Sequence, residues 1–452
     1  MNFVPITADD RKVMLAKIGV PSFETLLEGI PREIPRADLK LPAGLSESEL
    51  LRLTGDLASQ NVTTRSHISF LGAGAYEHLV PAAVRYLTSR GEFLTAYTPY
   101  QPEASQGTLQ AMYEFQSLLC DLTGMEAANC SLYEGASALA EACLVALRET
   151  ERGKLLIAET LHPEYRQTLG TYLKQTQVKI EPIPLHQGVC DLTAVRERVD
   201  SQTAAVVVQI PNAFGCLEPV AELGELAHRH GALFIVVVNP ISLGILKAPG
   251  SYGADIVVGE GQPLGTDLQY GGPYLGLFAC REKLLRKVPG RIVGMTRDTH
   301  GRRGFVLTLQ TREQHIRRAK ATSNICTNEA MMALASAVYL CSLGKEGFRE
   351  VANQNLQKAH YCFDQLTKIK GVRPLFPAPF FNEFALEMPL DPELINQRLL
   401  KEGFLGGFPL KRWDSIDSKG LALSKGWLVC VTEARAREEI DRFVAAVGKA
   451  IK

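Results

Sequence analysis

The chain has 452 residues, with 49 Lys and Arg residues against 49 Asp and Glu residues, so its formal charge at pH 7 is zero. This balance argues against a nucleic-acid-binding protein, whose surface has to be basic. Hydrophobic residues make up 46% of the chain and charged residues 22%, an ordinary globular composition that excludes a disordered or collagen-like chain.

Residues 1–65 are predicted to form a polar N-terminal arm. Asp9 and Asp10 open a predicted helix that ends at Ile18, and four prolines interrupt the segment that follows. We expect that such an arm cannot bury a core of its own.

Residues 66–330 are predicted to form a large domain. Short and almost continuous apolar runs are separated by amphipathic stretches such as residues 219–230; the runs are residues 154–158, 204–210, 232–238, 254–258 and 274–279. Strands that are apolar on both faces belong to a parallel or mixed sheet covered by helices. The pattern therefore predicts a three-layer α/β domain.

Residues 331–452 are predicted to form a smaller α+β domain. Helical patterns at residues 330–343 and 347–369 precede a strand pattern at residues 380–387. A helix at 392–402, a strand at 427–431 and a helix at 434–451 complete this part.

Several kinds of segment and site are not expected in this sequence. No stretch reaches the ~18 apolar residues of a membrane-spanning helix, and the N-terminus lacks the basic-then-apolar pattern of a signal peptide. The ten cysteines form no CxxC pair, so we expect reduced core thiols and no metal site. These features predict a soluble, cytoplasmic protein that binds no membrane.

A large parallel domain followed by a smaller α+β domain is the layout of fold-type I enzymes, which use pyridoxal phosphate (PLP). Cofactor use in that fold requires a phosphate cradle at a helix N-terminus, a ring-stacking group, a carboxylate beside the pyridinium nitrogen, and a lysine for the Schiff base. Layout alone does not give function, so each requirement has to be found in the residues.

The first two requirements have candidates near the first apolar run. Residues 135–137 open a predicted helix where backbone N–H groups would cradle a phosphate, but Glu134 precedes them and would repel it. We interpret Glu134 as a helix N-terminal charge. His162 stands where a ring-stacking side chain would project, although a lone loop histidine is more often merely hydrogen-bonded.

The last two requirements are not met. Asn239 follows a strand where an Asp is expected, and Asn cannot keep the pyridinium protonated. No lysine occurs between Lys247 and Lys283, where the Schiff-base residue is expected. A chain that has this architecture but lacks the residues for PLP chemistry suggests a partner that carries the cofactor.

Long strings of the sequence resemble the P-protein of the glycine cleavage system; they are residues 97–107, 253–265, 270–274, 291–295, 307–316 and 320–328. The resemblance covers essentially the whole chain. In that family the protein is either one chain of about twice this length or two separate chains, and this sequence is similar to the N-terminal half, the subunit 1 type. Counted from Gly253, Gln262 and Pro263 stand where the cofactor-bearing half has a His-Lys pair, and Pro263 has no amine to offer.

The resemblance implies a reaction shared by a complex. A partner subunit, P-protein subunit 2, would carry PLP, and the assembly would be an α2β2 heterotetramer. Glycine would be decarboxylated there, and its aminomethyl group would pass to the lipoyl group of the H-protein.

This chain could still supply side chains to the partner's active site. The candidates lie in a proline-interrupted loop, a common place for functional residues, together with one histidine; they are Tyr97, Tyr100, Gln101, Glu103, Ser105, Gln106 and His162. The two tyrosines could bound the glycine site or the lipoyl channel, and Gln101 or Ser105 could orient a carboxylate or phosphate. The loop could equally serve only the subunit interface.

A basic cluster follows further along the chain. Arg317, Arg318 and Lys320 could contact an acidic H-protein or the cofactor phosphate, or they could form a solvated helix face. Ala319 stands where the family more often has a charged residue, which weakens a role for that position.

Two other functions stay open on the sequence. One is a self-sufficient PLP lyase or aminotransferase that recruits Lys247 or Lys320 for the Schiff base. The other is a structural or regulatory pseudoenzyme that contributes nothing to the pocket.

Overall fold

The computed structural model describes residues 5–31, 34, 40–413 and 423–452, and the chain divides into two compact units, Met1–Ser66 and His67–Lys452. The first unit contains α1 (Ala8–Ile18), α2 (Phe23–Leu26) and α3 (Glu47–Ser59). Thr7 and Asp10 form a capping box at the start of α1, as predicted, and Gly19 ends it with a left-handed φ of 86°. None of the described side chains in this unit is buried, so this part has no core of its own.

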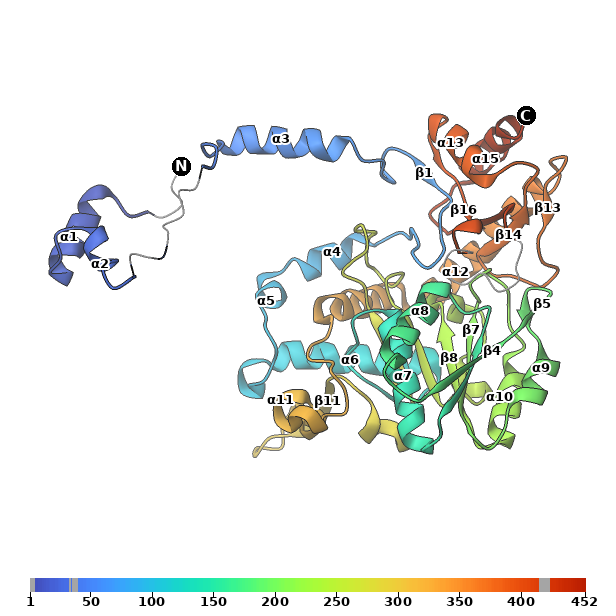
Figure 1. Ribbon diagram of the computed structural model, residues 1–452, viewed down its shortest axis with the longest axis horizontal. Helices are drawn as coiled ribbons and strands as arrows, with labels where there is room; N and C mark the ends of the chain where they lie inside the picture. The colour runs from blue at the N-terminus through green and yellow to red at the C-terminus, as the bar shows by residue number, and fades with distance from the viewer. Residues whose placement is uncertain (1–4, 32–33, 35–39, 414–422) are drawn as a thin grey trace. The chain divides into compact units, whose positions relative to one another are not determined.

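The second unit is built around a seven-stranded sheet (Figure 1) in the order β2-β10-β9-β8-β7-β3-β4. The strands are β2 (Ala127–Ala128), β3 (Lys154–Ala158), β4 (Lys179–Ile183), β7 (Thr203–Ile210), β8 (Leu233–Val238), β9 (Ile256–Glu260) and β10 (Gly276–Cys280). The central strands are parallel, and β10 is antiparallel to both β9 and β2. Each apolar run predicted as a strand forms one of them.

Helices cover both faces of this sheet; they are α6 (Gln106–Thr123), α7 (Gly135–Thr150), α8 (Pro163–Leu173), α9 (Leu192–Arg198) and α10 (Val220–Arg229). α7 packs on β7 to β10 and contacts α8, whereas α10 packs on β7 and β8 and contacts α9. In the strand order given above, the connection from β3 to β4 through α8 leads toward the β4 edge of the sheet, whereas the connection from β7 to β8 through α10 leads toward the β2 edge. Because such crossovers are right-handed, α8 and α10 lie on opposite faces, which gives the predicted three layers.

Smaller elements surround this sheet. α4 (Ala82–Thr88) and α5 (Gly91–Leu94) precede the candidate loop, which holds the turn η1 (Pro102–Ala104). The hairpin of β11 (Ile292–Arg297) and β12 (Arg303–Thr308) packs on α6, and the short α11 (Gln314–Arg317) and the turn η6 (Arg318–Lys320) follow it. Two further pairs are β1 (Ile68–Ser69) with β15 (Phe404–Leu405), and β5 (Leu185–His186) with β6 (Val189–Cys190).

The C-terminal elements form a second layered region with its own apolar cluster. α12 (Ala330–Leu366) leads into it and is interrupted at Gly344 (φ 60°), where the sequence predicts two separate helices. A four-stranded sheet contains β13 (Arg373–Pro374), β14 (Glu383–Glu387), β17 (Gly426–Cys430) and β16 (Phe408–Pro409), with α13 (Pro392–Lys401) and α15 (Arg437–Ala450) beside it (Figure 1). The domain boundary at residues 330 and 331 stays a prediction, because the compact units are divided only after Ser66.

The cysteines follow the prediction in most positions. All ten are unpaired, seven of them are buried, and Cys326 and Cys341 are exposed. In the described part of the chain, none of the helices has both the length and the apolar surface that crossing a membrane requires.

Candidate functional site

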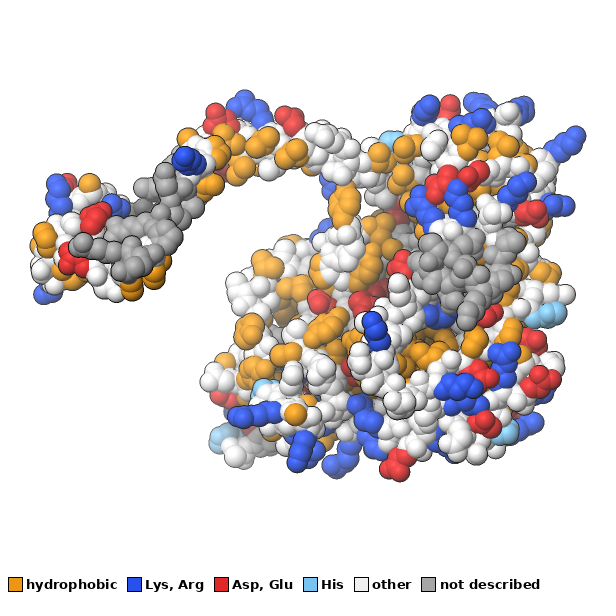
Figure 2. Space-filling model, in the orientation of Figure 1, with side chains coloured by type: hydrophobic (Ala, Val, Ile, Leu, Met, Phe, Trp, Pro, Cys, Tyr) orange, Lys and Arg blue, Asp and Glu red, His pale blue; other side chains and the backbone are white. Residues whose placement is uncertain are grey.

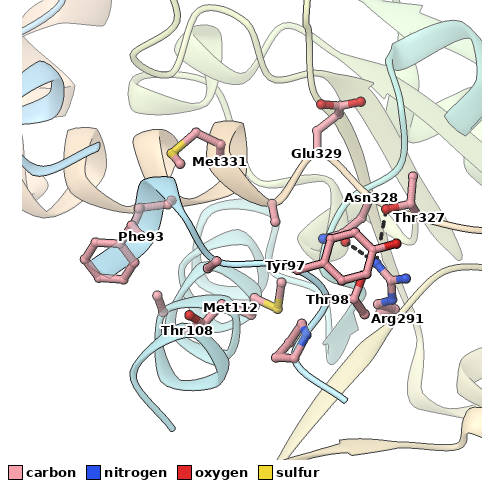
Figure 3. Close-up of a pocket in the computed structure, with 15 residues that line it drawn as sticks. Phe93, Tyr97, Thr98, Thr108, Met112, Arg291, Thr327, Asn328, Glu329 and Met331 are labelled. Carbon is pink, nitrogen blue, oxygen red and sulfur yellow. Dashed lines mark hydrogen bonds between the residues drawn. The ribbon is translucent and has the colours of Figure 1, made fainter. Parts of the chain in front are cut away.

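The candidate loop borders a cavity of about 280 Å³ (Figure 3). Its walls come from α5, α6, the loop between them, the start of α12, and the residue before β11. The lining residues used below are Tyr97, Thr98, Arg291, Thr327, Asn328 and Glu329. The cavity therefore joins segments that are about 200 residues apart in the sequence.

Arg291 is the most unusual residue of this cavity. Its side chain is 4% exposed, and its Nη1 donates to Oδ1 of Asn328 at 2.8 Å and to Oγ1 of Thr327 at 3.2 Å (Figure 3). Its Nη2 donates to the carbonyl of Cys326 at 3.0 Å, and its Nε has no partner. Among the described residues no carboxylate pairs with this guanidinium, so it is a buried cation with a donor to spare.

The sequence did not single out Arg291 as a site residue. It lies in one of the strings that resemble the P-protein family, and that was the only signal available. An isolated arginine in a strand pattern gives no sign that it will be buried without an acid partner.

Of the two predicted tyrosines, one lines this cavity and the other contacts Arg291 without lining it. Tyr97 lines it and is 88% exposed, whereas Tyr100 is 46% exposed. The guanidinium of Arg291 lies 5.8 Å from the centre of the Tyr100 ring, a cation–π distance. The ring of Tyr100 also makes an edge contact with the ring of His315, and the two ring centres are 5.8 Å apart.

The remaining loop candidates, like Tyr100, do not line the cavity. Gln106 opens α6, and its amide bonds to backbone groups of Pro102 and Phe305, which attach the loop to the β11–β12 hairpin. Gln101 and Glu103 are exposed in and before η1, and Ser105 is half-buried. Their part in a shared active site stays a prediction.

The basic cluster adjoins the loop through His315. Arg317, Arg318 and Lys320 are exposed on α11 and η6, and no ion pair joins them to the described acidic residues. Figure 2 shows Lys and Arg side chains gathered around the place that Figure 1 labels α11. The cluster is thus a solvated basic surface beside the cavity.

His162 lies apart from the other candidates, in a second cavity of about 350 Å³. This cavity is at the carboxyl ends of the parallel strands, where α/β folds bind their ligands. It is lined by Ala73, Gly74, Ala75, Glu134, Ala136, His162, Glu164, Tyr165, Thr168, Glu260 and Tyr274. A chain of this fold that held PLP would need its four cofactor-binding groups at this end of the sheet.

The phosphate position is filled by the chain itself. The carboxylate of Glu134 accepts hydrogen bonds from the backbone N–H groups of Ala136 at 2.5 Å and Ser137 at 2.7 Å. These are the donors that a phosphate would use at a helix N-terminus. The interpretation of Glu134 as a helix N-terminal charge is confirmed.

The place of the His-Lys pair is also used for internal structure, through Gln262 at the His position. Gln262 accepts from the backbone N–H of Tyr76 at 3.1 Å and donates to the carbonyls of Tyr76 at 3.0 Å and Thr266 at 2.7 Å. The next residue is Pro263, which has no amine. The loop of residues 72–76 is therefore fixed to the place where the Schiff base would form.

Two further side chains hold the same loop. His162 donates from Nε2 to the carbonyl of Ala73 at 2.9 Å, so its ring is engaged with the chain. The buried carboxylate of Glu383 accepts from the N–H of Ala73 and from the hydroxyl of Tyr76, both at 2.7 Å. Burial raises the pKa of Glu383 to about 7.

The remaining positions do not suit a pyridinium ring either. Asn239 uses its side chain to accept from the N–H of Ile241, which caps a short turn. Glu260 accepts from three backbone N–H groups, those of Gly135, Gln262 and Leu275, and burial raises its pKa to about 7. The residues present therefore do not fit PLP, and no catalytic step through PLP can be assigned to this cavity.

Comparison with known proteins gives a consistent result over the whole chain. A family model described as glycine cleavage system P-protein matches residues 1–447. A protein of Desulfitobacterium hafniense named "Probable glycine dehydrogenase (decarboxylating) subunit 1" is 52% identical over 450 residues, which is 99% of this chain and 100% of the relative.

Solved structures agree with this relationship. A crystal structure of glycine decarboxylase (P-protein) of the glycine cleavage system, in inhibitor-bound form, is similar with a TM-score of 0.91 and 45% identity, and all of both chains is covered. Glutamate decarboxylase of Lactobacillus brevis is similar with a TM-score of 0.68 at 13% identity, over 92% of this chain and 95% of that one. This second likeness shows the fold alone, and with it the predicted fold-type I architecture is confirmed.

Proposed function

Because the chain belongs to the glycine cleavage system P-protein family, we propose that it is subunit 1 of a two-subunit glycine dehydrogenase (decarboxylating) whose PLP is held by the other subunit. The complex decarboxylates glycine and transfers the aminomethyl group to the lipoyl group of the H-protein. PLP supplies the electron sink for the loss of CO2. This chain supplies part of the walls of the active site.

The observation that carries this proposal is the use of the cofactor positions for internal contacts. Glu134 accepts from the N–H groups that a phosphate would need, and Gln262 bonds to the backbone of Tyr76. Pro263 replaces the amine. A chain of this family without its own cofactor site depends on a second chain that has one.

The N-terminal unit supports the need for a partner. Its described side chains include many exposed apolar ones, among them Val13, Phe23, Leu50, Leu51 and Leu57, and none is buried. Apolar side chains on helices that bury nothing gain stability only against another surface. We assign that surface to the PLP-bearing subunit, in an α2β2 assembly.

The cavity around Arg291 is our candidate for the shared part of the active site. A buried guanidinium without a carboxylate partner among the described residues attracts an anion, and glycine presents a carboxylate. Tyr97 and Tyr100 would bound the path of the substrate or of the lipoyl arm. Four candidates have lower rank because they do not line the cavity and have no ring contact with Arg291 of the kind that Tyr100 has; they are Gln101, Glu103, Ser105 and Gln106.

The basic cluster beside this cavity is our candidate for docking the H-protein. Arg317, Arg318 and Lys320 are exposed, and a carrier protein that brings a lipoyl group to the cavity has to bind close by. An acidic surface on the carrier would match them and speed the encounter. A cytoplasmic location fits the ten unpaired cysteines, which persist as thiols in a reducing compartment.

The self-sufficient alternative has no support in the structure. Lys247 and Lys320 are both exposed, and neither lines one of the two cavities. The pseudoenzyme alternative differs from our proposal only in the role of the loop.

The discriminating experiment uses this chain reconstituted with its PLP-bearing partner and with H-protein. Tyr97→Phe removes a hydroxyl at the cavity, and Tyr100→Phe removes one from the ring that contacts Arg291. A hydroxyl that contacts the substrate contributes about 1 kcal/mol, so glycine–bicarbonate exchange should slow about fivefold or more in at least one variant. Unchanged kinetics in both variants, with assembly intact by sedimentation, would favour the pseudoenzyme.

A further inference from the structure

The loop that carries Tyr97 and Tyr100 has few attachments to the rest of the chain. It consists of the residues between α5 and α6, numbers 95–105. Residues 97–104 form hydrogen bonds within the loop, and among the described residues only the side chain of Gln106 joins them by a hydrogen bond to another part of the chain. The position of this loop therefore depends on that side chain and on the ring contacts of Tyr100.

Gln106 bonds to the edge of β12 as a backbone group would. Its Oε1 accepts from the N–H of Phe305 at 2.8 Å, and its Nε2 donates to the carbonyl of Phe305 at 2.9 Å. Nε2 also donates to the carbonyl of Pro102 at 2.7 Å, so both N–H groups of the amide are used. Phe305 is 5% exposed and belongs to an apolar cluster with Leu109 and Met112 of α6. The amide thus ties the loop to a firmly anchored strand.

The bond to Pro102 controls the direction of Tyr100 because the segment between them is stiff. Pro99 and Pro102 have a fixed φ, and the residue before each proline is restricted to extended backbone. Gln101 follows this rule, with φ −99° and ψ 98°. The N–H of Tyr100 donates to the carbonyl of Thr98 at 2.8 Å, which closes a tight turn. A shift at Pro102 therefore moves Tyr100 as well.

We propose that Gln106 is a positioning residue of the shared active site, an inference that rests on the proposed function. Gln106 does not line the cavity, so it acts through the loop and not by touching the substrate. It holds the arrangement in which the ring of Tyr100 lies 5.8 Å from the guanidinium of Arg291 and Tyr97 lines the cavity. Without the amide the loop has more arrangements, and binding has to select among them.

The first experiment measures the loop itself and needs no activity. Gln106→Met keeps the length of the side chain and removes its three hydrogen bonds. Gln110→Met is the matched control, because the side chain of Gln110 bonds to Glu114 on the same helix. The full-length chain is treated with chymotrypsin, and cuts after Tyr97 and Tyr100 are followed by mass spectrometry. We expect these cuts to be about fivefold faster in Gln106→Met and unchanged in the control.

The second experiment uses the chain reconstituted with its PLP-bearing partner and with H-protein. Gln106→Met should raise KM for glycine about tenfold and leave kcat within about twofold, because a displaced wall weakens binding while the chemistry on the partner is unaffected. A purely structural role of Gln106 would instead lower the fraction of assembled enzyme, so kcat would fall at unchanged KM. Gln110→Met should match the unaltered enzyme in both constants.

A double-substitution cycle shows whether Gln106 acts through a tyrosine. It combines Gln106→Met with whichever of Tyr97→Phe and Tyr100→Phe slows exchange. The tyrosine substitution should have little further effect in the combined variant, since its hydroxyl is already displaced. We expect the combined loss to be smaller than the product of the two separate losses by about threefold, the coupling of residues that share one network.

The contradicting outcomes are equally definite. Equal cleavage rates in Gln106→Met and the unaltered chain would show that the amide does not hold the loop, and the proposal would be refuted. An unchanged KM for glycine, or separate losses that multiply fully in the cycle, would refute it as well. The proposed function fails by a different result, which is the absence of any effect of both tyrosine substitutions when Gln106 is intact.

Discussion

Glu134→Ala is the substitution that most directly tests how the chain has closed its cofactor cavity. The carboxylate of Glu134 accepts from the N–H groups of Ala136 and Ser137 at the start of α7. Alanine would leave both donors open to the cavity, where water can reach them. The variant is then predicted to regain a phosphate-binding helix end.

The expected cost is set by the loss of one helix cap. Removing a side-chain cap costs about 1 kcal/mol, with a range of about 0.5 to 2, and the lost carboxylate–dipole attraction adds a few tenths. Weaker repulsion of Glu260, whose pKa Glu134 raises, offsets part of this. We expect a net loss of about 1 kcal/mol, or a Tm lower by roughly 1 °C for a unit of this size.

Inorganic phosphate should reverse this loss in the variant alone. Ligand at 100 times its Kd stabilises a protein by about 2.7 kcal/mol, which exceeds the cap. The assay is thermal unfolding in rising phosphate against chloride at equal ionic strength. Asp191→Ala is the matched control, because Asp191 caps α9 in the same way without lining the cavity. Equal phosphate effects in the unaltered chain, the control and Glu134→Ala would refute the reasoning.

Three further outcomes are expected. Arg291→Met should lower kcat/KM for glycine about 100-fold in the reconstituted enzyme, because it removes a charge-assisted contact worth ~3 kcal/mol. Arg297→Met, a control on the β11–β12 hairpin, should leave kcat/KM unchanged. Equal effects of the two substitutions would show that Arg291 does not belong to the active site. Deleting residues 1–66 should weaken association with the partner at least tenfold by sedimentation, and undiminished association would contradict the arm's role. Burial raises the pKa of Glu383 to about 7, so protonation of this side chain stabilises the folded state. Its contribution to the free energy of unfolding is complete below the unfolded pKa of ~4.3 and is lost as pH rises through 7, by about 3 kcal/mol. Because the pKa of Glu260 is also raised to about 7, Glu383→Gln should remove about half of the combined loss in denaturant titrations at pH 5 to 8, whereas Glu387→Gln, a control at the other end of the same strand, should retain all of it.

Much of the fold could be predicted because its strands are apolar on both faces. Each run from residues 154–158 to 274–279 is buried in the sheet, and such runs are read directly from sequence. Gly344 likewise divides α12 where the helical pattern breaks. These features depend on local periodicity, which a single sequence contains.

The candidate site was only partly predictable, because its decisive contacts join distant residues. Gln262 meets Tyr76 across 186 positions, and Glu383 meets Ala73 across 310. The sequence showed that Pro263 stands where the lysine amine would be. It could not show that the loop of residues 72–76 is hydrogen-bonded to the neighbouring Gln262. It also grouped His162 with the loop tyrosines, whereas the structure places His162 and Tyr97 in two different cavities.

The central claim is that the partner, and not this chain, holds the cofactor. The most direct test is borohydride reduction of the reconstituted complex in the presence of PLP, followed by mass spectrometry of both subunits. The account predicts a pyridoxyl-lysine in the partner and none in this chain, together with no Schiff-base absorbance when this chain is incubated with PLP alone at equimolar concentration. A stoichiometric pyridoxyl group on any lysine of this chain would contradict it.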